Sequence, residues 1–189
     1  MTSRFRSGAR TASGVRPASG GTRFGTRPLA AGLLTATVAL YMALVAFGNI
    51  TDFDTNRQFV RHVLAMDTTF KDPDLMWRAI TSGTLQDIAY VLIIIWETVA
   101  ALVLAVAAVA WLRGSRGGAG LGRARRLSTG GLLMVLLLFG AGFMAIGGEW
   151  FAMWQSKSWN GLDAAARNFM VAGIVLLVVQ LPGTATAEE

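Results

Sequence analysis

Four long apolar runs alternate with polar segments along the chain. They lie at about residues 28–47, 88–112, 130–145 and 164–181, and the third continues toward Trp154. A helix needs roughly 20 residues, at 1.5 Å each, to cross the hydrocarbon core of a bilayer. The runs are apolar on nearly every side, and a helix satisfies its own backbone hydrogen bonds in lipid. The pattern predicts an all-α fold, a polytopic membrane protein with four transmembrane helices.

The polar segment at residues 49–87 is too long for a plain turn. Within residues 57–66 the apolar side chains fall on one helical face, which predicts a short helix lying on the membrane surface or on the bundle. That face consists of Phe59, Val60, Val63 and Leu64. The sequence Asp72-Pro73-Asp74 is typical of a helix start and predicts a second short helix that ends near Gly83. We therefore expect a short-helix cap on the outer face.

Two pairs of polar residues resemble helix caps at the end of the outer segments. Thr84 with Asp87 resembles a capping box that opens the second long helix. Asn160 with Asp163 stands in the same relation to the fourth long helix. Both pairs predict where an inward-running helix begins.

Basic residues predict the orientation in the membrane. Residues 1–27 hold six arginines and no acid, and the connection at residues 113–126 holds five arginines and no acid. The positive-inside rule places both segments in the cytoplasm, so residues 49–87 and 149–163 face outward. We therefore expect a multi-pass protein of the cell (inner) membrane with both termini cytoplasmic.

This pattern also divides the chain into domains. Residues 1–27 are too polar to fold and should form a disordered basic cytoplasmic tail, residues 28–182 the four-helix transmembrane domain, and residues 183–189 a short cytoplasmic tail. A secretory signal is the alternative reading of the first apolar run. That run exceeds the usual signal core of roughly 7–15 residues, and no A-x-A site closes it, which favours a membrane anchor.

Composition narrows the classes of chemistry. The chain is 53% hydrophobic and only 15% charged, and it contains no cysteine. Disulfides, thiolate catalysis, zinc–thiolate sites and iron–sulfur ligation are therefore excluded. The net charge of +6 stands next to apolar helices, which indicates membrane orientation and not nucleic-acid binding.

Glu97 is the most informative single residue, because it lies inside the second apolar run. Counted from Tyr90 at the outer boundary, it is about 10 Å deep. A carboxylate at that depth should be paired, protonated or facing a wet cavity. Arg167 is the nearest expected cation, with Arg78 and Arg61 as alternatives. Glu97 would act in a proton or ion relay, anchor a bound head group, or form a structural ion pair. Because no second acid lies deep in a predicted helix, the structural ion pair is favoured.

Further polar residues near the outer mouth complete a candidate cluster. Glu149 follows two glycines at the outer end of the third run and would either join Glu97 in a two-carboxylate site or bind Lys157 or backbone amides. No spacing of the H-x-x-E or E-x-x-H kind is present, so no metal is predicted. The candidate functional or structural polar cluster is Glu97, Glu149, Arg167, Arg78, His62 and Asp67.

The sequence contains no set of residues that predicts catalysis or a cofactor. With a single histidine, one chain cannot supply two histidine ligands to haem. No Ser/His/Asp set forms a nucleophile elbow, and the glycines of residues 114–122 lie among arginines, which is typical of a flexible basic linker. The sequence therefore favours a non-enzymatic protein without a cofactor.

Tryptophans are concentrated after the third apolar run. The stretch GGEWFAMWQSKSWNG carries Trp150, Trp154 and Trp159, which are most simply interfacial anchors. Because the stretch is denser in aromatic residues than anchoring requires, a partner surface or a lipid or quinone head-group pocket is the alternative.

The outer motifs resemble a known family. NITDFDTNRQFVRHVLAMDTT, the WRAI at Trp77, the IIIWET around Glu97 and GGEWFAMWQSKSWNG are similar to the bacterial predicted small integral membrane proteins, domain-of-unknown-function family 2165. The similarity runs from about residue 28 to residue 181. It implies four transmembrane helices and implies no activity.

Three hypotheses for function follow. The first is a non-enzymatic accessory or assembly component of a membrane complex, with the lipid bilayer, a membrane protein partner or a homo-oligomer as its contacts. The second is a small transporter or proton/ion-coupled protein that uses Glu97. The third is a quinone- or lipid-head-group-binding membrane redox component. The single deep glutamate suits a structural pair or a binding pocket better than a relay.

Overall fold

The computed structural model of the protein describes residues 26–117 and 120–181. These residues form helices and contain no strand, which confirms the all-α prediction. Four helical segments are long and apolar enough to cross a membrane. They are α1 (Thr26–Thr51), α3 (Gly83–Gly117), α4 (Leu121–Leu136) with its continuation η2 (Leu137–Trp150), and α5 (Leu162–Gln180). The predicted tails, residues 1–27 and 183–189, lie outside the described residues except for residues 26 and 27.

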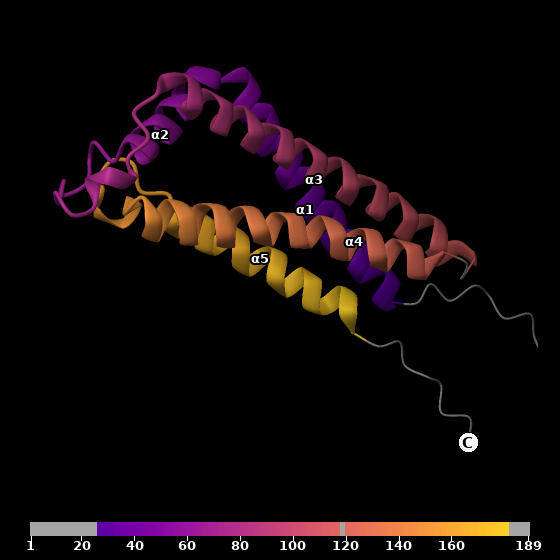
Figure 1. The fold of residues 1–189 in the computed structure, drawn as a ribbon. Coiled ribbons are helices and arrows are strands. Elements are labelled where there is room, and N and C mark those ends of the chain that lie inside the picture. The colour runs from indigo at the N-terminus through magenta and orange to yellow at the C-terminus, as the bar shows by residue number, and fades with distance from the viewer. Residues whose placement is uncertain (1–25, 118–119, 182–189) are drawn as a thin grey trace, which may run out of the picture.

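Neighbouring helices along the chain pack side by side (Figure 1). α1 packs along α3, α3 along α4, and α4 along α5, while α5 also contacts η2 and α1. The start of α1, the α3–α4 connection and the end of α5 lie toward one end of the bundle. We name it the basic end after Arg27, Arg113, Arg123, Arg125 and Arg126. The opposite end carries the cap, which we define as residues 52–82 and 151–161.

A buried polar contact joins three helices near the basic end. Ser128 Oγ of α4 accepts a hydrogen bond from Trp111 Nε1 of α3 at 2.9 Å and lies 3.2 Å from Thr35 Oγ1 of α1. All three side chains are buried. Polar side chains in an apolar bundle need such partners, so this contact fixes the relative height of the three helices.

The α3–α4 connection is shorter than the sequence predicts. Residues 114–122 are expected to form a flexible linker, but α3 continues to Gly117 and α4 already begins at Leu121. Gly120 has a φ of 97° in the left-handed region, which lets the chain reverse between the helices. A Cβ on Gly114 would lie 2.9 Å from Leu121 Cδ2, so this glycine permits a close approach at the turn. The linker prediction was therefore wrong at these described positions.

The third membrane helix changes its winding halfway. α4 continues without interruption into η2, a π-helix of 14 residues, although π-helices are mostly single-turn bulges. Trp96 Nε1 of α3 donates to the Met134 carbonyl at 2.9 Å, just before the change. η2 ends at Trp150 because Ala152 adopts a left-handed conformation with a φ of 51°. The short 3₁₀ helix η3 (Met153–Gln155) follows.

The first predicted cap helix is confirmed. α2 (Phe53–Ala65) begins four residues before the predicted range of 57–66, ends one residue before its end, and packs against α3 and α1. It ends at Met66, whose φ of 52° and whose N–H bond to the Val63 carbonyl close the last turn. Val60 is buried on the predicted apolar face, together with Tyr90 and Ile94 of α3.

The second predicted cap helix is nearly absent. Only η1 (Met76–Arg78), a 3₁₀ helix of three residues, forms in this segment. Ala79 is extended, with a ψ of 132°, and the N–H of Ile80 donates to the Leu64 carbonyl at 2.8 Å. The segment therefore lies against the end of α2, and this tertiary contact replaces the helix that the prediction extended to Gly83.

Neither of the two predicted capping boxes forms. Asn160 Oδ1 accepts the Leu162 N–H at 3.1 Å, but the N-cap of α5 is Gly161 and no side chain caps the helix. Asp87 does not close a capping box, because both of its oxygens accept hydrogen bonds from Arg57 and Arg61 of α2. The sequence identified a helix start correctly there but assigned Asp87 to the wrong partner.

Candidate functional site

The predicted polar cluster is divided among separate places in the fold. Glu149 and Arg167 are exposed, and their side chains form no hydrogen bond or ion pair with other described residues. His62 Nδ1 lies 2.8 Å from Asp67 Oδ2, and the His62 ring stacks on Trp159 with ring centroids 4.6 Å apart. These contacts hold the end of α2 against the loop before α5.

Arg78 belongs to an aromatic group on the cap. Its guanidinium lies 5.6 Å from the ring centroid of Trp77 and 4.9 Å from that of Trp150. The two tryptophans meet edge to face, with ring centroids 5.6 Å apart. Such stacking stabilises a cation without a carboxylate partner.

Glu97 has an amide partner instead of the expected arginine. Its side chain is only 2% exposed, and Oε2 accepts a hydrogen bond from Asn49 Nδ2 of α1 at 2.7 Å. The backbone carbonyl of Asn49 accepts a second hydrogen bond, from the Tyr90 hydroxyl at 2.9 Å. The expected pair with Arg167 does not form, because Arg167 points outward at the start of α5 while Asn49 reaches the carboxylate from the end of α1.

An arginine pair fastens the cap to α3. Arg57 Nε and Nη2 donate to the two oxygens of Asp87 at 2.8 and 2.9 Å, and Arg61 does the same at 3.0 and 2.9 Å. The hydrogen bond to Asp87 raises the pKa of Arg57. A raised arginine pKa means that this contribution is fully present below the ordinary arginine pKa and is lost only in strong alkali. The attachment of α2 should therefore not vary across the neutral range.

Two cavities adjoin under the cap. The first, which we name the Glu97 cavity, has a volume of about 280 Å³, and its polar lining residues are Asn49, Asn56, Tyr90, Glu97 and Asn168. The second, the apolar cavity, has a volume of about 310 Å³ and lies between α2, α3 and η2. The two cavities share a wall made of Phe59, Val60, Ile93 and Phe143.

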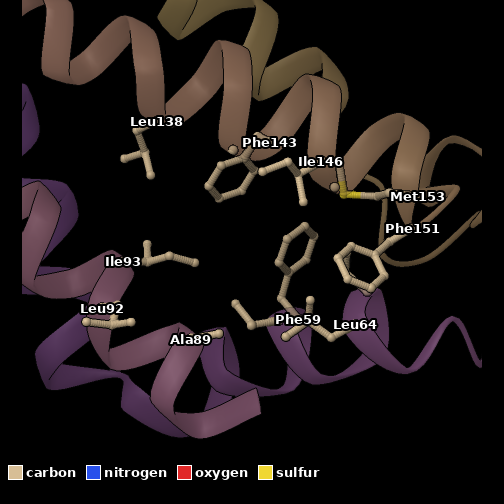
Figure 2. A pocket seen from close by; sticks show the side chains of 14 residues that line it. Phe59, Leu64, Ala89, Leu92, Ile93, Leu138, Phe143, Ile146, Phe151 and Met153 are labelled. Atoms are coloured by element: carbon tan, nitrogen blue, oxygen red, sulfur yellow. The ribbon is translucent and has the colours of Figure 1, made fainter. Parts of the chain in front are cut away.

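Figure 2 shows how the apolar cavity is lined. Phe59 projects from α2 between Phe143 and Ile146 of η2 on one side and Phe151 on the other, while Leu92 and Ile93 project from α3. The rings of Phe59 and Phe143 lie nearly parallel, with centroids 6.3 Å apart. Apolar side chains make up the lining, with glycine completing it on η2. An occupant of this space would be recognised through dispersion and loss of apolar hydration alone.

Comparison with known proteins identifies the family. A family model described as "Predicted small integral membrane protein (DUF2165)" matches residues 28–182. The chain belongs to this family. The match confirms the resemblance seen in the outer motifs and agrees with a multi-pass integral membrane protein, but it assigns no activity. No curated protein and no solved structure matches the chain.

Sequence reasoning missed several residues of the two cavities. Asn49 and Asn168 come from the first and fourth membrane helices, and nothing in their spacing indicates that they line the same cavity as Glu97. Phe143 lies in an apolar run, where its sequence neighbours do not distinguish it. A single asparagine inside or at the end of such a run was the available signal, because a polar amide in a membrane helix normally has a polar partner.

The acidic side chains and His62 lie in separate contacts. Across residues 26–117 and 120–181, His, Asp and Glu side chains form no group of three or more that would hold a metal ion. His62 and Asp67 meet at the cap, while Glu97 lines its own cavity next to Asn49.

Proposed function

We propose that the protein binds an amphipathic molecule of the membrane. The polar group of this molecule would lie at Glu97, and its apolar chain would lie between α2, α3 and η2. The observation that supports this proposal is the shared wall of the two cavities, which places a buried carboxylate and an entirely apolar chamber next to each other. Concave apolar sites with a few convergent polar groups are the usual form of a ligand site.

The surroundings of the apolar cavity favour a ligand that arrives from the bilayer. Leu92 and Ile146 line the cavity and are also 59% and 53% exposed on the outside of the bundle. In a membrane-spanning helix, an exposed apolar side chain faces lipid. A chain-bearing molecule would therefore reach the cavity sideways between α3 and η2, without crossing the polar cap.

The proposal is tested by filling the apolar cavity. Ala89 of α3 is partly buried in its lining, and Ala89→Phe would occupy the space. Ile95→Phe on the same helix is the matched control, because Ile95 is 52% exposed and lines neither cavity. Native mass spectrometry of protein purified from its own membrane in mild detergent would show a retained small molecule in wild type and Ile95→Phe, and about tenfold less in Ala89→Phe. Wild-type protein that retains nothing, or equal retention in both variants, contradicts the proposal.

A second candidate function is supported by an aromatic surface formed by the cap and the adjoining end of η2. We define this surface as Phe70, Trp77, Trp150 and Trp154, whose side chains are 71%, 70%, 46% and 50% exposed. The pairs Phe70–Trp154 and Trp77–Trp150 both meet edge to face. Exposed tryptophans are enriched where proteins bind one another, so the surface fits an accessory or assembly component of a membrane complex.

This second candidate has a separate test. Trp77→Ala with Trp154→Ala should release a co-purifying membrane protein that wild type retains, as measured by quantitative mass spectrometry. Leu177→Ala is the control, because Leu177 is 69% exposed on α5 and lies outside the aromatic surface. Retention of every partner by the double variant would leave these tryptophans as membrane-interface anchors.

We also propose an orientation for the bundle. Arginines collect at the basic end, and the acids of the cap are mixed with its basic residues. Lys and Arg excess marks the cytoplasmic side of membrane proteins. The basic end would therefore face the cytoplasm across the cell (inner) membrane, and the cap would face outward.

A further inference from the structure

We propose that the polar group bound at Glu97 is cationic, so that the ligand is an amine or quaternary ammonium carried on an apolar chain. This inference rests on the proposed function and specifies the class of its ligand. The observations that support it are the missing partner of the Glu97 carboxylate, the neutral lining around it and the aromatic walls of the same cavity.

Glu97 is buried without a positive charge beside it. Among the described residues it forms no ion pair, and Asn49 Nδ2 is its one hydrogen-bond donor. Oε2 takes that bond, and Oε1 is left without a protein donor while Glu97 lines the cavity. Burying a charge costs free energy unless an opposite charge compensates it. The site therefore suits a ligand that carries the compensating positive charge.

Among the described residues, no lysine, arginine or histidine lines the Glu97 cavity. The arginines of the cap have other partners, because Arg57 and Arg61 bind Asp87 and Arg78 lies between two tryptophans. The other polar residues that line the Glu97 cavity are the neutral Asn49, Asn56, Tyr90 and Asn168. Asn168 Oδ1 itself accepts a hydrogen bond from the Tyr41 hydroxyl at 2.8 Å. The cavity therefore offers one carboxylate and no positive charge to a ligand.

Aromatic rings complete a setting that suits a cation. Phe59, Tyr90, Phe139 and Phe143 line the same cavity as Glu97. The ring centroids of Phe139 and Phe143 are 5.5 Å apart, and those of Phe59 and Phe143 are 6.3 Å apart. The faces of aromatic rings attract ammonium groups, whereas they and a carboxylate both repel a phosphate or a carboxylate on the ligand. An anionic lipid head group is therefore excluded by the same residues that would hold an ammonium.

The test measures which charge the site prefers. Protein in nanodiscs of digalactosyldiacylglycerol, a neutral lipid without an ammonium group, would be titrated with radiolabelled dodecyltrimethylammonium, 1-dodecanol and dodecanoate. These carry chains of equal length and head groups of charge plus one, zero and minus one. Binding is counted as the saturable excess over empty nanodiscs. We expect the ammonium to bind at least about tenfold more tightly than the alcohol, and the carboxylate not to bind measurably.

Variants of two glutamates show which residue causes the preference for the ammonium head group. Glu97→Gln should remove the preference, so that the ammonium and the alcohol bind equally and the alcohol binds as it does in wild type. Glu149→Gln is the matched control, because Glu149 is exposed and lines neither cavity, and it should bind like wild type. Glu97→Asp keeps the charge on a shorter side chain and should keep the preference, which provides a second readout if Glu97→Gln does not fold.

The outcomes separate this inference from the proposed function. If the alcohol or the carboxylate binds wild type as tightly as the ammonium, or if Glu97→Gln and Glu97→Asp both keep or both lose the preference, the ligand is not recognised by charge at Glu97. The proposed function then stands with a neutral or anionic ligand. If none of the three amphiphiles binds saturably to folded wild-type protein, the inference is wrong, and the purification experiment decides whether the proposed function is wrong as well.

Discussion

At the scale of single residues, Asn49 is the contact that defines the buried site. Its backbone carbonyl accepts the Tyr90 hydroxyl and its side-chain amide donates to Glu97, so one residue of α1 reaches two residues of α3. Tyr90 and Glu97 are seven positions apart, two helical turns, and therefore share a face of α3. The amide also orients the carboxylate and leaves Oε1 on the cavity side.

Replacing Asn49 should cost stability through Glu97. Asn49→Ala removes the one hydrogen-bond donor that the described part of the chain gives this buried carboxylate, and we expect the free energy of unfolding to fall by about 1–3 kcal/mol. Asn49→Asp should cost more, because it places a second carboxylate beside the first. Unfolding in sodium dodecyl sulfate, followed by circular dichroism, measures both values.

The control for this series lies on the same helix. Thr37 is exposed, and its hydroxyl bonds only to the Leu33 carbonyl one turn earlier. Thr37→Ala should therefore change stability by no more than about 0.5 kcal/mol. Equal effects of Asn49→Ala and Thr37→Ala would show that the bond to Glu97 carries no net stabilisation.

At the scale of helices, close packing of α3 and α4 depends on Gly131. A Cβ at this position would lie 2.6 Å from Leu104 Cγ and 2.7 Å from Leu104 Cδ2. Leu104 is fully buried, so its side chain cannot move out to the surface to make room. Small residues permit such approach between membrane helices, where packing and not hydration holds the bundle together.

Two adjacent glycines provide a matched test of this contact. Gly131→Ala should lower the free energy of unfolding by about 1–3 kcal/mol, because the added methyl overpacks the interface with Leu104. Gly130→Ala meets nothing within 4 Å and should be neutral or stabilise by up to about 1 kcal/mol through helix propensity. The same detergent unfolding experiment applies, and an equal loss in both variants would contradict close packing at Gly131.

At the scale of the whole molecule, the bundle has two chemically different ends. The basic end carries arginines without a nearby acid in its connection, and the cap carries both signs of charge together with the exposed Phe70, Trp77 and Trp154. The two cavities under the cap would then open toward the outer half of the bilayer. The orientation of the bundle therefore decides which leaflet supplies the ligand.

Single cysteines can report this orientation, because the chain has none of its own. Asp74→Cys on the cap should react with a membrane-impermeant maleimide in intact cells, since the cap is expected to face outward. Gly122→Cys at the basic end, where a Cβ meets nothing within 4 Å, should react only after the membrane is permeabilised. The reverse labelling pattern would invert the proposed orientation.

Much of the fold was predictable from the sequence, because its cause is local. Runs of apolar residues specify membrane helices through length and composition, and each of the four predicted runs corresponds to a helix. The apolar face of residues 57–66 likewise predicted α2. Predictions failed where a distant contact competed with a local signal. Asp72-Pro73-Asp74 starts no long helix because residue 80 bonds to Leu64, and Asp87 caps nothing because α2 supplies two arginines.

By itself, the sequence determined that this is a four-helix membrane protein. It also determined that Glu97 is the unusual residue within it, because a carboxylate inside a long apolar run can be recognised from the order of residues alone. Only the tertiary structure decided what surrounds that carboxylate. Asn49, Phe143 and Asn168 come from three other helical segments, and the register and spacing of packed helices brought them to Glu97 and excluded Arg167. Such register depends on side-chain packing between segments far apart in the chain, which no local pattern encodes.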